Sequence, residues 1–132
     1  MHALFVDDEV EFLQLMEKRL SRRGMTIVTA PDGQSALDIV TEAMKQPETM
    51  FQVVVMDVRM PGMDGLKATR ILREYARFDN LPIIAMTAHA MHGDEERSFA
   101  AGMNAHLTKP IDVRELVFSL SRWGSAARRN RK

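Results

Sequence analysis

The sequence contains no cysteine, carries no formal net charge and has no long apolar stretch in its 132 residues. Without cysteine the chain forms neither a disulfide nor a thiolate metal site, a composition compatible with a reducing compartment. Because 18 basic residues balance 18 acidic ones, no overall positive field attracts nucleic acid, and direct nucleic-acid binding is not expected. No apolar stretch approaches the roughly 18 residues of a membrane span, and the first residues do not resemble a signal peptide. We therefore expect one cytoplasmic domain with no membrane segment in this chain.

Four short apolar runs end on side chains that can bind a cation or a phosphoryl group. The runs cover residues 3–6, 53–56, 83–86 and 105–108, and they end at Asp7-Asp8, Asp57, Thr87 and Lys109. Near-continuous apolar runs are typical of parallel strands that are covered on both faces. Open α/β sheets bind their ligands at the carboxyl edge of such strands. The spacing therefore predicts that three carboxylates, a hydroxyl and an ammonium group meet at one edge of a sheet.

Longer stretches with apolar residues at helical spacing separate these runs. The stripes are Leu13, Met16 and Leu20; Ala36, Leu37, Val40 and Met44; Ala68, Ile71, Leu72 and Tyr75; and Val113, Leu116, Val117 and Leu120. Along the whole chain, short apolar runs and stretches of helical period alternate five times. This alternation predicts one α/β domain with right-handed crossovers and helices on both faces of the sheet. Residues 91–101 are less amphipathic, so their surface is expected to serve something besides core packing. The pattern stops after Trp123, which predicts a domain over residues 1–123 and a basic tail or linker over residues 124–132.

The residues at the expected edge have the chemistry that phosphoryl transfer requires. Hard carboxylate oxygens suit Mg²⁺, which keeps water and phosphate oxygens in its other positions. Asp57 stands alone at its strand end and is the candidate nucleophile, which would form an acyl phosphate by attack on phosphorus. Mg²⁺ and Lys109 would neutralise negative charge, and the Thr87 hydroxyl would donate to a phosphoryl oxygen. Each residue alone has a structural explanation, such as a helix cap or a surface lysine. The prediction therefore depends on all of them occurring at strand ends of one short domain.

Four motifs make the sequence resemble the receiver domain of two-component response regulators from residue 2 to about residue 123. They are FVDDE at residues 5–9, MDVRMPGMDG at 56–65, AMTA at 85–88 and LTKPI at 107–111. The resemblance implies a flavodoxin-like fold, a doubly wound parallel sheet with strand order 2-1-3-4-5. It also implies that Asp57 accepts phosphate, in a Mg²⁺-dependent reaction, from a phosphohistidine on a histidine kinase or a histidine phosphotransfer domain. Slow autodephosphorylation would end the signal, and no separate substrate would be turned over.

The resemblance implies a set of metal ligands around the acceptor. Asp8, Asp57 and the backbone carbonyl of Arg59 would bind Mg²⁺ directly, and Asp7 would act through water. Arg59 also lies two residues past the acceptor, and His89 lies two residues past the threonine of the third run. In the family these two positions control attack by water. Because both side chains can carry positive charge beside the phosphoryl group, we expect them to alter its lifetime.

A further group of residues would report the phosphorylated state. Lys109 would contact the phosphoryl group, with a cis peptide bond to the proline that follows. Thr87 would move toward a phosphoryl oxygen and thereby switch the surface of residues 91–122, which a downstream effector or a second copy of the chain would bind. The family usually has tyrosine or phenylalanine where this sequence has His106. The smaller, titratable ring predicts either a weakened or pH-sensitive switch or an exposed histidine without a role, and both interpretations stay open.

Two other functions fit parts of the sequence. A phosphorylation-independent interaction module would keep the fold as a scaffold, but the intact set of site residues counts against it. A phosphatase or nucleotide-binding enzyme of related topology is disfavoured because there is no GxGxxG motif after the first strand and no P-loop. Residues 86–112 are similar to receivers of hybrid histidine kinases, which pass phosphate to a histidine phosphotransfer domain. The sequence leaves open whether the chain is a stand-alone regulator or part of such a kinase.

Overall fold

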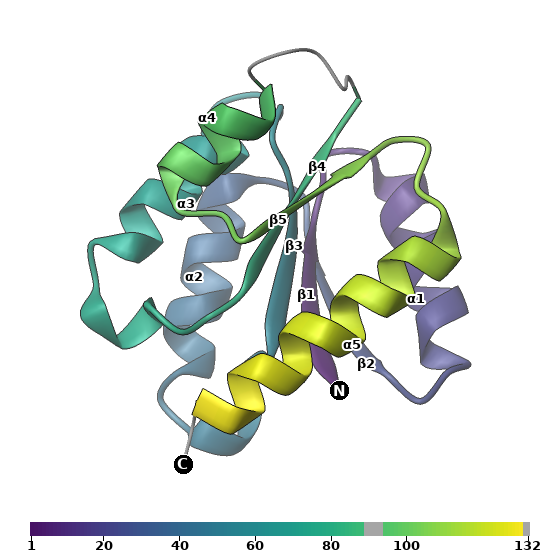
Figure 1. Ribbon diagram of the computed structural model, residues 1–132, viewed down its shortest axis with the longest axis horizontal. Coiled ribbons are helices and arrows are strands. Elements are labelled where there is room, and N and C mark those ends of the chain that lie inside the picture. The colour runs from purple at the N-terminus through teal and green to yellow at the C-terminus, as the bar shows by residue number, and fades with distance from the viewer. Residues whose placement is uncertain (89–93, 131–132) are drawn as a thin grey trace.

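A computed structural model of the chain describes residues 1–88 and 94–130 (Figure 1). Five parallel strands form one sheet in the order β2-β1-β3-β4-β5, which confirms the predicted fold class. The strands are β1 (His2–Val6), β2 (Thr26–Ala30), β3 (Val53–Asp57), β4 (Ile83–Thr87) and β5 (Ala105–Thr108). The order reverses direction between β1 and β3, and open sheets of this kind bind ligands at that switch point.

Helices cover both faces of the sheet, with α1 and α5 on one face and α2, α3 and α4 on the other (Figure 1). The helices are α1 (Val10–Ser21), α2 (Gly33–Ala43), α3 (Gly65–Arg73), α4 (Asp94–Ala101) and α5 (Val113–Asn130), with short 3-10 turns η1 (Pro47–Thr49) and η2 (Ala76–Phe78). None of the helices in the described parts of the chain is long and apolar enough to cross a membrane.

Alternate residues of the central strands enter two separate hydrophobic clusters. In β1, Leu4 and Val6 pack against α2 and α3, whereas Ala3 and Phe5 pack against α1 and α5. All five residues of β3 are buried because both faces of the sheet are covered. This two-sided burial explains why the strand sequences lack a polar face. It also fixes the register that brings the strand ends to one edge.

Aspartate side chains bind the first turns of three helices. Asp32 and Asp64 cap α2 and α3, where their side chains accept hydrogen bonds from the backbone N–H groups of Ser35 at 2.7 Å and Lys67 at 2.8 Å. Asp112 accepts from a backbone N–H in the first turn of α5 in the same way. These caps satisfy N–H groups that have no partner inside their helices.

Two expectations are wrong. Tyr75, predicted to continue the buried stripe of α3, is 48% exposed. The helix ends at Arg73, so Tyr75 no longer follows the helical period, and its ring lies instead beneath the guanidinium carbon of Arg77 at 5.2 Å. The helical pattern also does not stop after Trp123, because α5 continues to Asn130. Alanine and arginine dominate that last stretch, and their high helix propensity extends the helix beyond its apolar stripe. A domain over residues 1–123 with a basic tail or linker at 124–132 otherwise stays a prediction.

Candidate phosphoryl-acceptor site

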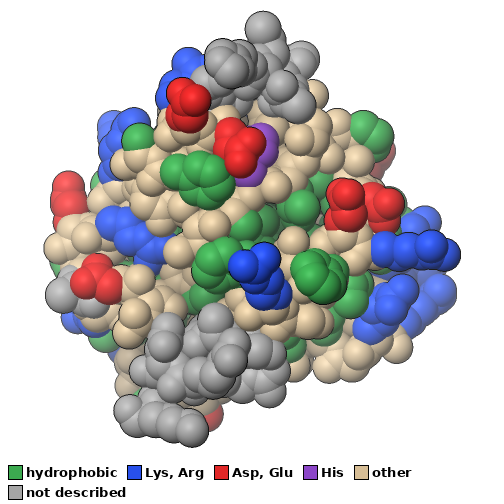
Figure 2. Space-filling view, in the orientation of Figure 1, with side chains coloured by type: hydrophobic (Ala, Val, Ile, Leu, Met, Phe, Trp, Pro, Cys, Tyr) green, Lys and Arg blue, Asp and Glu red, His purple; other side chains and the backbone are tan. Residues whose placement is uncertain are grey.

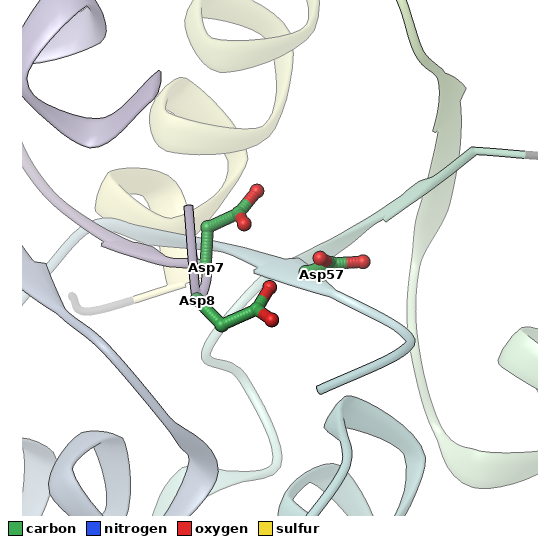
Figure 3. Close-up of side chains that lie close together, drawn as sticks. All are labelled: Asp7, Asp8 and Asp57. Atoms are coloured by element: carbon green, nitrogen blue, oxygen red, sulfur yellow. The ribbon is translucent and has the colours of Figure 1, made fainter. Parts of the chain in front are cut away.

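Three carboxylates meet at the carboxyl edge of the sheet, as the sequence predicted. Asp7 and Asp8 follow β1, and Asp57 ends β3, so all three lie beside the switch point (Figure 3). One carboxylate oxygen from each lies within 4.8 Å of the others. Three hard oxygen donors at this separation suit a divalent cation such as Mg²⁺.

The three carboxylates differ in how much protein surrounds them. Asp7 is fully buried, Asp57 is 6% exposed, and Asp8 is exposed. Both oxygens of Asp7 accept hydrogen bonds, Oδ1 from the Glu9 backbone N–H at 2.9 Å and Oδ2 from the Lys109 ammonium at 2.7 Å. Asp7 is therefore occupied by protein donors, whereas Asp8 presents its carboxylate to solvent.

Lys109 supplies the positive charge of the site. Its Nζ atom lies 2.7 Å from Asp7, 3.1 Å from Glu9 and 3.4 Å from Asp57. Burial alone lowers the pKa of Lys109, but the hydrogen bond to Asp7 and the charges of Asp57 and Asp7 outweigh it, so the pKa is raised above its usual value. The peptide bond from Lys109 to the following proline is cis, as predicted. Lys109 is therefore a permanently charged neighbour of the acceptor carboxylate.

The electrostatics of Asp57 reflect crowding of like charge. Burial, and then the charge of Asp7, raise the pKa of Asp57 to about 6, while Lys109 and the Arg59 backbone N–H act in the opposite direction. That N–H donates to Asp57 Oδ1 at 3.2 Å. Since a bound cation favours the ionised carboxylate, metal binding and deprotonation of Asp57 are coupled.

The predicted switch residues lie on the two neighbouring strands. Thr87 ends β4 and is 1% exposed, and its backbone carbonyl accepts a hydrogen bond from the Lys109 N–H at 2.7 Å. A displacement of the Thr87 backbone would therefore move or break its hydrogen bond with the Lys109 backbone. His106 lies on β5 opposite Ala85 in the parallel register, and its buried Nε2 atom has no hydrogen-bond partner within the described segments. His106 is thus part of β5, and β4 separates this strand from β3, which ends at Asp57.

The structure describes one of the two positions expected to set the phosphoryl lifetime, Arg59. The Arg59 side chain is exposed, and its backbone contacts Asp57 as described above. His89 lies outside the described residues. Their effect on autodephosphorylation therefore stays a prediction.

Sequence reasoning missed three residues that shape the site. Glu9 and Phe12 both contact the Lys109 ammonium, at 3.1 Å and at 5.1 Å from the ring centroid. The sequence identifies Gly65 only as the last residue of the motif at 56–65, but a Cβ atom added there would overlap the carbonyl oxygen of Asp57. The Asp64-Gly65 pair at the start of α3 was the available signal for Gly65. Nothing in the sequence pairs Glu9 or Phe12 with a lysine about a hundred positions away.

Replacing Gly65 by alanine is expected to destabilise the protein and distort the acceptor loop. The added methyl group meets backbone atoms at the end of β3, which cannot move away as a flexible side chain would. We expect a loss of about 3 kcal/mol in the free energy of unfolding, measured by chemical denaturation. Gly24→Ala is the control, because Gly24 has a φ of 86° but open space around it. That variant should lose only about 1 kcal/mol, and an equal loss in both variants would contradict the prediction.

The strand order, the acidic cluster at the switch point and the lysine beside it define a flavodoxin-like α/β domain with a site for a cation and a phosphoryl group. The chain belongs to the response regulator receiver domain family, whose pattern it matches over residues 3–121. It is thus a receiver domain of two-component signalling, in agreement with the resemblance in its motifs.

Known proteins support this assignment. The chain is 38% identical over 131 residues to sensor protein GacS of Pseudomonas syringae pv. syringae, covering 97% of this chain and 14% of GacS. It is 37% identical over 116 residues to hybrid signal transduction histidine kinase I of Dictyostelium discoideum, covering 86% of this chain and 7% of that protein. The chain therefore spans a small part of these relatives. The Saccharomyces cerevisiae Ssk1 receiver domain, crystallised with the histidine phosphotransfer protein Ypd1, has the same fold at a TM-score of 0.84, with 23% identity and coverage of 95% of this chain and 89% of that one.

Proposed function

We propose that the protein is a phosphorylated signalling receiver whose Asp57 accepts a phosphoryl group in a Mg²⁺-dependent reaction. One observation carries this proposal. The Asp57 carboxylate lies within 4.8 Å of carboxylate oxygens of Asp7 and Asp8 and within 3.4 Å of the Lys109 ammonium. A nucleophilic carboxylate, a candidate cation site and a fixed positive charge are thus within reach of one phosphoryl group.

Mg²⁺ would be held by Asp8, Asp57 and the backbone carbonyl of Arg59, and it would supply positive charge to the transferring phosphoryl oxygens. The donor set fits such an ion, because the three carboxylates gather at one point and one of them is exposed. Asp7 is proposed to act through water, since both of its oxygens already accept hydrogen bonds from the protein.

The reaction transfers a phosphoryl group from imidazole nitrogen to carboxylate oxygen. An Asp57 oxygen donates an electron pair to phosphorus, and the phosphorus–nitrogen bond of the donor phosphohistidine breaks with its electron pair staying on the imidazole. Lys109 opposes the negative charge on the phosphoryl oxygens. Later attack by water on phosphorus regenerates the Asp57 carboxylate and inorganic phosphate, and the Arg59 and His89 side chains are proposed to set that rate.

The phosphoryl donor is proposed to be a histidine kinase or a histidine phosphotransfer domain. The yeast receiver with the same fold was crystallised with a partner of the second kind, which supports this class of donor. Thr87 and His106 are proposed to transmit the change toward α4, β5 and α5, over residues 91–122. Phe99 of α4 is 45% exposed and Phe118 of α5 is 70% exposed. Figure 2 shows hydrophobic side chains at the surface of the face that carries these two helices. An effector or a second copy of the chain is proposed to bind there.

Incubation with acetyl phosphate should add one phosphoryl group to the protein in Mg²⁺ and none in excess chelator. Intact-mass spectrometry measures the adduct, and peptide mapping after borohydride reduction should locate it at Asp57. The reason is that the three carboxylates repel the anionic phosphoryl group of acetyl phosphate unless a cation neutralises them first.

Beryllofluoride, which mimics a phosphoryl group on a carboxylate, should bind under the same conditions and change the amide NMR spectrum. If neither reagent produces a Mg²⁺-dependent change, the phosphoryl-acceptor function is wrong and the scaffold function is favoured.

A further inference from the structure

The Lys109 ammonium is held toward α1 rather than toward the acceptor. Its shortest contacts are with Asp7 and Glu9, and the distance to Asp57 is the longest of the three. The Phe12 ring, also from α1, lies 5.1 Å from the ammonium nitrogen. Three of the groups that surround Lys109 therefore come from the end of β1 and the start of α1.

Glu9 is well placed to hold this position. Its backbone N–H donates to Asp7 at 2.9 Å, and its backbone carbonyl accepts from Leu13 at 3.2 Å, which fixes the residue at the start of α1. Its side chain makes no capping bond to the helix. The carboxylate, although 66% exposed, reaches Lys109 instead.

The donors of Lys109 limit what else it can bind. A lysine ammonium has three N–H donors, and three carboxylates accept from this one. A phosphoryl oxygen on Asp57 can take over the long contact of 3.4 Å to Asp57, but a short bond requires the ammonium to move away from Asp7 or from Glu9. Asp7 is fully buried and would be left without its donor. Glu9 is mostly exposed, so water can replace the lost contact at little cost.

Resting on the function proposed above, we propose that Glu9 is a positioning residue that competes with the phosphoryl group for the Lys109 ammonium. Release of the Glu9 contact accompanies phosphorylation, and the strength of that contact sets how tightly the phosphoryl group is held. Phe12 provides the surface over which the ammonium lies before its release. The chemical class that displaces Glu9 is a tetrahedral anionic group on Asp57.

Glu9→Gln should bind beryllofluoride roughly two- to fivefold more tightly than the wild-type protein in saturating Mg²⁺, the range expected for an exposed ion pair. The amide keeps the size of the side chain but loses the charge that attracts Lys109. Affinity is measured by NMR titration, with the Mg²⁺ affinity of each variant determined separately so that saturation is ensured. Glu11→Gln is the matched control, since it removes an exposed charge from the first turn of α1 and should leave the affinity unchanged.

A second readout follows the lysine itself. The Phe12 ring should shift the Lys109 ε-methylene proton resonance upfield in the metal-free protein, and beryllofluoride should reduce that shift as the ammonium moves toward Asp57. Phe12→Leu, which lacks the ring, identifies the resonance. If the wild-type protein binds beryllofluoride while Glu9→Gln and Glu11→Gln show the same affinity, or while the Lys109 resonance does not move, the Glu9 proposal is wrong. If the wild-type protein binds no beryllofluoride, the phosphoryl-acceptor function itself is wrong.

Discussion

An Asp57→Asn variant is expected to be more stable than the wild-type protein by about 2 kcal/mol in metal-free buffer near pH 7.5, and to accept no phosphoryl group. Asp57 is buried beside Asp7, and both causes raise its pKa to about 6. An ionised Asp57 therefore destabilises the folded state at neutral pH. Asparagine has nearly the same shape and removes that charge, while its amide oxygen can still accept a hydrogen bond from Lys109.

The direction of the pH dependence follows from the raised pKa of Asp57. Between about pH 4 and pH 6 the folded protein holds a proton on Asp57 that the unfolded chain has released, so wild-type stability falls as the pH rises through this window. The advantage of Asp57→Asn should be absent below this window and fully developed above it. Chemical denaturation at a series of pH values in chelator gives the two stability curves.

Two comparisons control this result. Asp38→Asn removes an exposed helical carboxylate and should change stability by less than about 0.5 kcal/mol. Mg²⁺ should stabilise the wild-type protein much more than Asp57→Asn, because the variant lacks one anionic ligand. If Asp57→Asn is no more stable than Asp38→Asn in chelator at neutral pH, the carboxylate cluster is not under electrostatic strain.

The sheet and its acidic edge could be predicted because both depend on local patterns. Buried parallel strands are apolar throughout, and the carboxyl ends of parallel strands meet at one edge, so Asp57 and Lys109 come together once the strand order is right. The cap residues of α2 and α3 follow from side chains that bond to the next turn. These features require knowledge of neighbours that lie close in sequence or on adjacent strands.

Other contacts could not be predicted because they depend on how loops pack together. The Arg73 guanidinium donates to the Gly102 carbonyl at 3.0 Å and to Asn104 at 2.9 Å, and it also bonds to the Phe78 carbonyl. These bonds join the end of α3 to the loops around β4 and β5. No periodicity or motif in the sequence pairs these residues. The contact between Glu9 and Lys109 is of the same kind, since it depends on the direction in which the α1 start enters the site.

Lys109→Met is expected to have the opposite effect to Asp57→Asn, a loss of about 3 kcal/mol in metal-free buffer at neutral pH. The Lys109 side chain is 16% exposed and makes a hydrogen bond of 2.7 Å to fully buried Asp7. Methionine fills similar space but leaves Asp7 without that donor and leaves Asp57 facing it without a cation. The same variant should also lose most of its Mg²⁺-dependent phosphorylation.

Lys45→Met is the matched control, because the Lys45–Glu42 pair, with an N···O distance of 2.9 Å, has side chains that are 66% and 74% exposed. Loss of such a pair should change the free energy of unfolding by less than about 0.5 kcal/mol. Adding Asp7→Asn to Lys109→Met should recover part of the stability, so the double variant is less destabilised than the two single effects predict together. Equal stability of Lys109→Met and Lys45→Met in denaturation experiments would show that Lys109 does not neutralise the carboxylates.

Asp57→Asn and Lys109→Met should change the stability of one cluster in opposite directions, because the first removes a negative charge and the second removes a positive one. Removing the Asp57 charge should relieve its repulsion with Asp7, whereas removing the lysine should leave that repulsion without a neighbouring cation. Mg²⁺ should therefore reduce the deficit of Lys109→Met, since it supplies positive charge to the same carboxylates. Acidification through the pKa of Asp57, which is raised to about 6, should reduce the deficit as well, because a protonated Asp57 needs no cation. A deficit that neither Mg²⁺ nor acid changes would assign the role of Lys109 to packing rather than to charge.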